Sequence, residues 1–231
     1  MPNLRRLDPV RTPFQILFFR FWYWVVMLLY TLVYRVRLYN TGNVPDTGGL
    51  LVIANHQSHL DPPLVGIGIR RRNIAPIARE GLFRVPLLGW LLRGLGCIAI
   101  KEEEGDAGAI RKAIAALKEG RVVVIFPEGS RTPDGQIKEF KRGMWILMSR
   151  AGVPVLPAAV EGCYDAWPRR QLFPKLFGYR VGAIYGEPIA PDTLKKMGAD
   201  AGLAMLRDEV GELRSELGRR LNRVPPQHVP A

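Results

Sequence analysis

A long apolar segment near the N-terminus restricts the architectures open to this chain, because lipid or a hydrophobic core has to cover it. Residues 14–34 are almost wholly apolar, and the only interruptions are Gln15, Arg20 and Thr31. One helix of this length would extend about 30 Å, roughly the thickness of the hydrocarbon part of a bilayer. The sequence therefore predicts a helix of membrane-spanning length ahead of the rest of the chain.

The composition and flanks of this segment indicate how it meets a membrane. Thr12 and Pro13 are suited to the N-cap and the first position of a helix. Aromatic residues, which prefer the headgroup boundary, occur in the middle of the segment as well as at its ends. Arginines lie on both sides and give no preferred orientation: Arg5, Arg6, Arg11, Arg35 and Arg37. We therefore expect residues 1–38 to form a membrane anchor.

This anchor is expected to be a helix or a helix pair, monotopic or partially inserted, on an anionic cytoplasmic leaflet. A complete transmembrane span and a buried core helix remain alternatives. A cleaved signal peptide is disfavoured, because the apolar run is long and aromatic and no small-residue cleavage site follows it.

Size and charge narrow the class of protein further. A chain of 231 residues that is 48% hydrophobic can build one sizeable core. Its net charge of +12 favours polyanionic partners such as anionic lipid, phosphorylated substrates or nucleic acid. Nucleic acid is disfavoured, because the basic residues are scattered and no recognised binding motif occurs. Cys97 and Cys163 are predicted to be reduced core residues of a cytosolic protein.

Beyond the anchor, short apolar runs alternate with helical patterns. The predicted strands are residues 36–40, 50–54, 74–78, 97–100, 122–126, 155–160 and 179–185. Helices are predicted over residues 62–69, 86–95, 106–120 and 144–151, followed by a terminal helix with one apolar face: Leu203, Leu206, Val210, Leu213, Leu217 and Leu221. This alternation predicts a single α/β domain over residues 39–222, with a mostly parallel or mixed sheet flanked by helices, and a tail at residues 223–231.

Polar residues follow the predicted strand at residues 50–54. His56 comes just after the strand, and Asp61 follows five residues later, in front of Pro62. In open α/β sheets this edge is where ligands usually bind. A histidine with a carboxylate to orient it is the minimal equipment for activating a hydroxyl. Two other interpretations compete: a structural histidine at a strand end, and an aspartate that serves as the N-cap of the next helix.

A second polar segment follows the predicted strand at residues 122–126. Gly129 allows a ligand to approach the backbone closely, and Arg131 can bind a phosphate through two parallel hydrogen bonds. Lys101 can add a second positive charge. Alternatively, Glu128 and Arg131 form an ordinary surface ion pair that contributes little to the stability of the fold.

Four segments in this order resemble the motif blocks of the glycerolipid acyltransferases, and in particular the bacterial 1-acylglycerol-3-phosphate acyltransferases. His56 and Asp61 match the H-x-x-x-x-D signature. The three other blocks correspond to residues 96–101, 126–132 and 153–157, although Lys101 stands where arginine is commoner. The resemblance covers about residues 50–160, so the N-terminal segment and the C-terminal third lie outside it.

The resemblance implies the glycerol-phosphate acyltransferase fold and a chemistry. His56 would be the general base and Asp61 its orienting partner, in a transfer from an acyl thioester to a lysophospholipid hydroxyl. The donor is expected to be acyl-coenzyme A or an acyl carrier protein, without any further cofactor. The acceptor's phosphate would be bound by Lys101, Glu128, Gly129 and Arg131, with Glu128 orienting either Arg131 or the acceptor hydroxyl.

The expected substrate is 1-acylglycerol-3-phosphate, the product is phosphatidate, and the expected location is the cytoplasmic face of the cell inner membrane. No metal is expected, because His59 gives the motif the spacing H-x-x-H-x-D rather than that of the zinc hydrolases. Two alternatives remain. One is acylation of a different lyso-acceptor, such as an ornithine-type lipid, and the other is a basic membrane-binding protein without catalysis.

Overall fold

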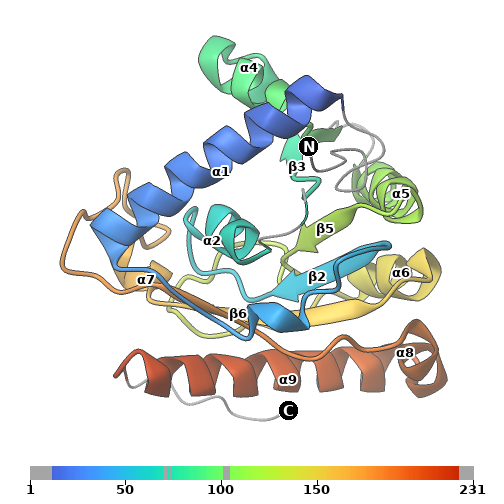
Figure 1. Cartoon of the computed structure of the whole chain (residues 1–231). Helices are drawn as coiled ribbons and strands as arrows, with labels where there is room; N and C mark the ends of the chain where they lie inside the picture. The colour runs from blue at the N-terminus through green and yellow to red at the C-terminus, as the bar shows by residue number, and fades with distance from the viewer. Residues whose placement is uncertain (1–11, 70–71, 73, 101–104, 224–231) are drawn as a thin grey trace.

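The computed structural model describes residues 12–69, 72, 74–100 and 105–223. Its centre is a five-stranded sheet in the order β1-β7-β6-β2-β5 (Figure 1). These strands are β1 (Arg37–Tyr39), β2 (Leu50–Ala54), β5 (Val122–Ile125), β6 (Val155–Glu161) and β7 (Gly182–Tyr185). All neighbouring strands are parallel except β6 and β7. A separate parallel pair consists of β3 (Ile77–Arg79) and β4 (Ile98–Ile100).

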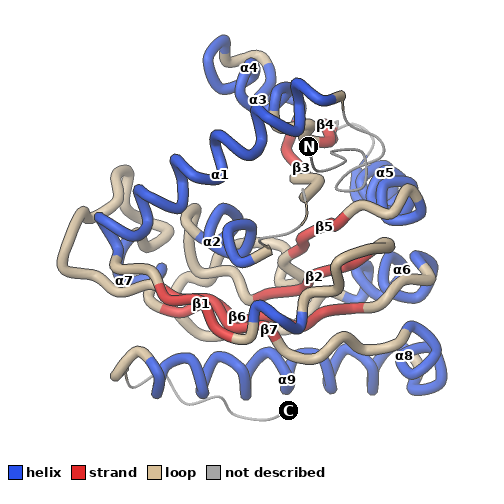
Figure 2. The backbone as a smooth tube through the Cα atoms, in the orientation of Figure 1, coloured by secondary structure: helices blue, strands red, loops and turns tan. Residues whose placement is uncertain are grey.

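Helices cover both faces of the central sheet, as Figure 2 shows. Helix α9 (Ala199–Arg220) packs on β6 and β7 on one face, together with α6 (Arg142–Ala151), α5 (Gly105–Lys118) and α8 (Pro191–Met197). The other face is covered by α2 (Asp61–Gly68), and α1 (Pro13–Tyr34) lies over α2. The short elements are η2 (Thr41–Asn43), α3 (Glu80–Phe83), α4 (Pro86–Gly94) and α7 (Cys163–Ala166). Because the sheet is covered on both faces, every residue of β2 and of β6 is buried.

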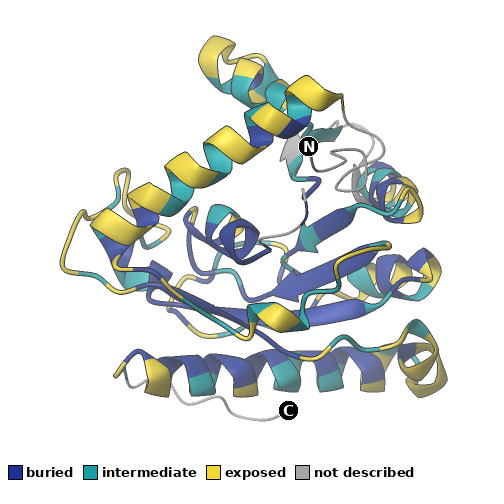
Figure 3. Ribbon diagram, viewed as in Figure 1, coloured by how far each residue is buried: buried dark blue, intermediate teal, exposed yellow. Residues whose placement is uncertain are grey.

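Helix α1 begins at Pro13, as predicted, with Thr12 as its N-cap and Gln15 completing a capping box. One side of the helix packs on the domain, where the Tyr30 hydroxyl donates to the Leu60 carbonyl at 2.9 Å. The other side is exposed along its whole length (Figure 3). Among the described residues, α1 is the one helix that is long and apolar enough to cross a membrane. Only 11% of its most apolar 18-residue stretch is buried inside the structure.

The predicted fold class is confirmed: a mixed sheet flanked by helices in one α/β domain. The apolar face predicted for the terminal helix is buried throughout. Several details of the prediction were wrong. The strands predicted at residues 74–78 and 179–185 begin at Ile77 and Gly182, and the helices α3, α7 and α8 were not predicted. Asp61 is the first residue of α2, so the alternative interpretation of Asp61 as the N-cap is excluded. Cys163 is buried as predicted, whereas Cys97 is only half-buried.

Candidate active site

Parallel pairing brings three polar segments to one edge of the sheet. Strand β2 lies between β5 and β6, so the residues that follow these three strands are neighbours. The Asn55 side chain both accepts from the Val160 backbone N–H at 2.8 Å and donates to the Val160 carbonyl at 3.0 Å. The Thr132 backbone N–H donates to the His56 carbonyl at 2.8 Å. The backbone at His56 is therefore held from both sides.

His56 and Asp61 form a hydrogen-bonded pair at this edge. His56 Nδ1 lies 2.8 Å from Asp61 Oδ2, and the same oxygen accepts from the backbone N–H groups of Gln57 at 2.5 Å and Ser58 at 2.6 Å. The Asp61 side chain is fully buried, whereas 18% of the His56 side chain is exposed. The Phe126 ring stacks on the imidazole with 4.2 Å between ring centroids. Because the Asp61 carboxylate can only accept a hydrogen bond, the proton of the His56 ring lies on Nδ1. Nε2 then carries the free lone pair and can act as a base.

Glu128 is buried, which excludes the alternative interpretation of a surface ion pair with Arg131. Its Oε1 accepts from the His56 backbone N–H at 2.7 Å, and its Oε2 accepts from the Lys138 backbone N–H at 3.2 Å. Glu128 therefore ties the histidine's backbone to the loop after β5. Burial raises the pKa of the Glu128 carboxyl from 4.5 to about 6, against the opposing effect of these two hydrogen bonds.

We expect Glu128→Gln to change how stability depends on pH. A native pKa above the unfolded value means that folding favours the protonated acid, so the wild type loses stability as pH rises from about 4.5 to 6. The loss is about 2 kcal/mol and is absent from the glutamine variant. Denaturant unfolding at pH 4 and pH 7 measures it, with the exposed Glu187→Gln as the matched control. Equal pH dependence of wild type and Glu128→Gln would contradict the assignment.

Arg131 lies beside the His56 and Asp61 pair and is only partly solvated. Its Nη1 is buried and has no hydrogen-bond partner in the part of the chain that the structure describes. Desolvation, followed by the nearby Arg169 guanidinium, lowers the pKa of Arg131. Arg169 Nη1 also donates to the Arg131 carbonyl at 3.4 Å. Two guanidinium groups close together, one with an unused buried donor, form a place that favours an anion.

Two lysines join this basic cluster from the loop that follows β5. Lys138 Nζ donates to the Ser130 hydroxyl at 2.6 Å. The Lys141 side chain crosses Gly129, where a Cβ atom would collide with it. Gly129 also has φ +71°, a conformation that glycine adopts without strain. The sequence did not identify Lys138, Lys141 or Arg169, because no spacing rule places them beside Arg131. Lys101 lies outside the described residues.

The donor set of the site is that of an acid–base centre. Within the described ranges, His, Cys, Asp and Glu side chains form no group of three that could hold a metal ion. The His59 ring lies against the Trp167 ring, with 5.1 Å between ring centroids. The arrangement can take a proton at His56 Nε2 and bind an anion near Arg131.

Comparisons with known proteins agree with this arrangement. A 1-acyl-sn-glycerol-3-phosphate acyltransferase of Bacillus subtilis is 27% identical over 189 residues, which cover 82% of this chain and 91% of the relative. A lyso-ornithine lipid O-acyltransferase of Pseudomonas aeruginosa is 32% identical over 153 residues, covering 64% of this chain and 56% of the relative. The chain spans about half the length of several curated relatives that it matches.

The fold also has a solved counterpart. The crystal structure of the 1-acyl-sn-glycerophosphate acyltransferase PlsC from Thermotoga maritima is similar with a TM-score of 0.69 and 29% sequence identity. The similarity covers 90% of this chain and 79% of that one. The family model described as Acyltransferase matches residues 35–161, which include the His56 and Asp61 pair and the Arg131 loop. With the motifs, the site geometry and the fold in agreement, this chain belongs to the acyltransferase family.

Proposed function

We propose that this chain transfers a fatty acyl group from a thioester to the sn-2 hydroxyl of 1-acylglycerol-3-phosphate and so makes phosphatidate for phospholipid biosynthesis. The observation that carries the proposal is the His56 and Asp61 pair at the sheet edge, with Nε2 left as a base beside a basic cluster. The names of the Bacillus relative and of the Thermotoga structure support the same acceptor.

The reaction uses His56 as general base. Its Nε2 takes the proton of the acceptor hydroxyl while that oxygen attacks the thioester carbonyl. The tetrahedral intermediate then collapses: the new C–O bond remains, the C–S bond breaks, and the proton passes from His56 to the leaving thiolate. The Asp61 carboxylate stabilises the imidazolium formed between these steps. A thioester is activated enough that no covalent acyl-enzyme is needed.

The acceptor's phosphate is proposed to bind at Arg131. The buried Nη1 donor can make a charge-assisted hydrogen bond without displacing an existing partner. Gly129 shapes the loop, and Glu128 acts indirectly by holding the His56 backbone. Lys101 remains a predicted contributor from the neighbouring motif block. With these roles, the acceptor's hydroxyl is proposed to lie at His56 and its phosphate at Arg131.

Replacing Arg131 by alanine is expected to act on the acceptor rather than on the thioester. Losing a charge-assisted hydrogen bond costs about 1.5–3 kcal/mol, or roughly 10- to 150-fold in kcat/KM for the acceptor. Arg131→Lys should recover only part of this, because lysine lacks the bidentate fork. Steady-state kinetics with 1-acylglycerol-3-phosphate and with monoacylglycerol measure the phosphate preference, and the exposed Arg142→Ala is the control. Equal losses on both acceptors would remove the phosphate-binding role.

A second acceptor class is favoured by one observation. The lyso-ornithine lipid acyltransferase of Pseudomonas aeruginosa is 32% identical to this chain over 153 residues, and the 1-acyl-sn-glycerol-3-phosphate acyltransferase of the same organism is 31% identical over 153 residues. A lyso-ornithine lipid acceptor carries no phosphate, so the two functions differ in the need for an anion site. Assaying the purified full chain with coenzyme A and carrier-protein thioesters, against a panel of lyso-acceptors, tests both. Phosphatidate should be the main product; preferential acylation of lyso-ornithine lipid would select the alternative.

The proposed place of action is the membrane surface. Helix α1 is apolar along its outer side and packs on the domain along its inner side, which fits a monotopic or partly inserted anchor. We propose that the chain lies on the cytoplasmic face of the inner membrane. There the lysophospholipid acceptor is embedded in the bilayer, and the soluble thioester donor, coenzyme A or carrier protein, arrives from the aqueous side.

A further inference from the structure

The loop between α7 and β7, residues 168–180, combines exposed apolar and basic side chains and lies outside the family's motif blocks. Its large apolar side chains are between 59% and 80% exposed: Leu172, Phe173, Leu176 and Phe177. Basic residues are interleaved with them: Arg169, Arg170, Lys175 and Arg180. Exposed apolar clusters of this kind mark interaction surfaces, and the cations specify an anionic partner.

The loop has a defined conformation. The Lys175 backbone N–H donates to the Ala166 carbonyl at 2.8 Å and closes the first part of the loop. Within the segment that this bond closes, the Trp167 indole N–H donates to the Gln171 carbonyl at 3.0 Å. Leu172 and Phe173 lie within this closed segment and are its most exposed apolar side chains, at 80% and 75%, so we call them the apolar tip of the loop.

The loop lies beside the C-terminal end of α1. The Val181 backbone N–H, just after the loop, donates to the Tyr34 carbonyl at the end of α1 at 3.2 Å. A surface hollow there is lined by both segments, with Arg35 on one side and residues 178–180 on the other. Figures 1 and 3 show the loop on the same side of the molecule as the exposed face of α1.

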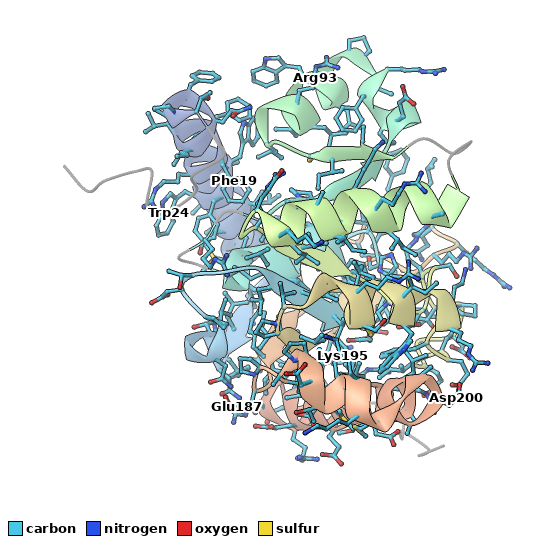
Figure 4. The ribbon with its side chains drawn as sticks, turned by 90° about the vertical axis from the view of Figure 1, so that its right-hand side faces the viewer. Phe19, Trp24, Arg93, Glu187, Lys195 and Asp200 are labelled. Carbon is cyan, nitrogen blue, oxygen red and sulfur yellow. The ribbon has the colours of Figure 1, made fainter. Side chains whose placement is uncertain are left out.

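The opposite end of α1 carries a third apolar element. Helix α4 packs against it through an edge-to-face contact of Phe18 and Trp90, with 5.1 Å between ring centroids. Leu87 and Trp90 of α4 remain exposed. The loop and α4 thus flank the two ends of α1, whose outer face is apolar and exposed. Lys195 of α8 lies well away from Phe19 and Trp24 of α1 (Figure 4).

We propose that the loop of residues 168–180 inserts its apolar tip into an anionic lipid bilayer, alongside α1. The bilayer is the partner that suits a surface built from three separate elements with cations between the apolar residues. The base of the loop reaches the site: the Ser58 hydroxyl donates to the Trp167 carbonyl at 2.8 Å, and Arg169 donates to Arg131. Insertion therefore sets the active site at the membrane surface, a consequence that rests on the proposed function.

The first test is vesicle binding by the full chain. Replacing Leu172, Phe173 and Phe177 together by serine should weaken partition into anionic phosphatidylglycerol vesicles by about tenfold or more. The control variant replaces Ile146 and Met197, exposed residues of α6 and α8, and should change partition less than about twofold. Circular dichroism and thermal unfolding check that both variants fold.

The second test uses the unmodified chain and limited trypsin digestion. Anionic vesicles should protect the Lys175–Leu176 bond and leave the Lys195–Lys196 bond in α8 as accessible as before. Neither readout involves turnover, so a chain that fails to acylate any acceptor still gives a result. Unchanged partition of the triple variant, or unchanged cleavage after Lys175, overturns the proposal. The proposal is also overturned if the triple variant keeps vesicle binding but no longer binds an acidic acyl carrier protein, because the loop would then contact that protein and not the bilayer.

Discussion

His56→Ala is expected to lower the turnover number by about 10²–10⁴, the usual contribution of a general base. The loss falls on the chemical step, because the imidazole Nε2 is the group that accepts the hydroxyl proton. The fold should survive, because the backbone bonds of His56 to Glu128 and Thr132 remain, although its side-chain hydrogen bond to Asp61 is lost. Single-turnover transfer with saturating thioester and acceptor measures the effect.

His59→Ala is the matched control for this variant. His59 belongs to the same motif, but its ring packs on Trp167 and makes no hydrogen bond to Asp61 within the described residues. Its loss should be far smaller than that of His56→Ala. Near-normal turnover in a well-folded His56→Ala protein would exclude the base mechanism.

Asp61→Asn should lower the turnover number on a similar scale, about 10²–10⁴, because the amide cannot stabilise an imidazolium. It should also cost about 1.5–3 kcal/mol of stability, since Asp61 Oδ2 accepts charge-assisted bonds from His56, Gln57 and Ser58 in a fully buried position. Turnover and denaturant unfolding measure the two effects separately. The exposed Asp192→Asn is the control, and an active Asp61→Asn enzyme would mean that the carboxylate only orders the loop.

Much of the fold was predictable because the strands of this sheet are short, continuous apolar runs. Residues 50–54 and 122–126 are rich in branched aliphatic side chains and bounded by turn residues, so they are read correctly without knowing their neighbours. Pro86 and Gly120 mark one helix start and one helix stop. The strand order and the antiparallel step between β6 and β7 depend on long-range pairing, which local periodicity does not contain.

The candidate site was likewise predictable only where its contacts are local in the sequence. The prediction brought His56 and Asp61 together because five residues across a strand end allow a direct contact. Glu128 was expected to orient Arg131 or the acceptor hydroxyl; in the folded chain its Oε1 accepts from the His56 backbone N–H, a long-range contact that the local sequence does not contain. Arg169 could not be found, because it reaches Arg131 only through the path of a loop 38 residues further on.

The most direct test of the account is the stoichiometry of acyl transfer by the purified full chain in detergent. A single reaction with an acyl thioester and 1-acylglycerol-3-phosphate should release one thiol for each phosphatidate formed, and omitting the acceptor should abolish thiol release. Thiol release that continues at the same rate without acceptor, or a folded protein that forms no ester with any lyso-acceptor, would contradict an acyl transfer in which His56 activates the acceptor hydroxyl.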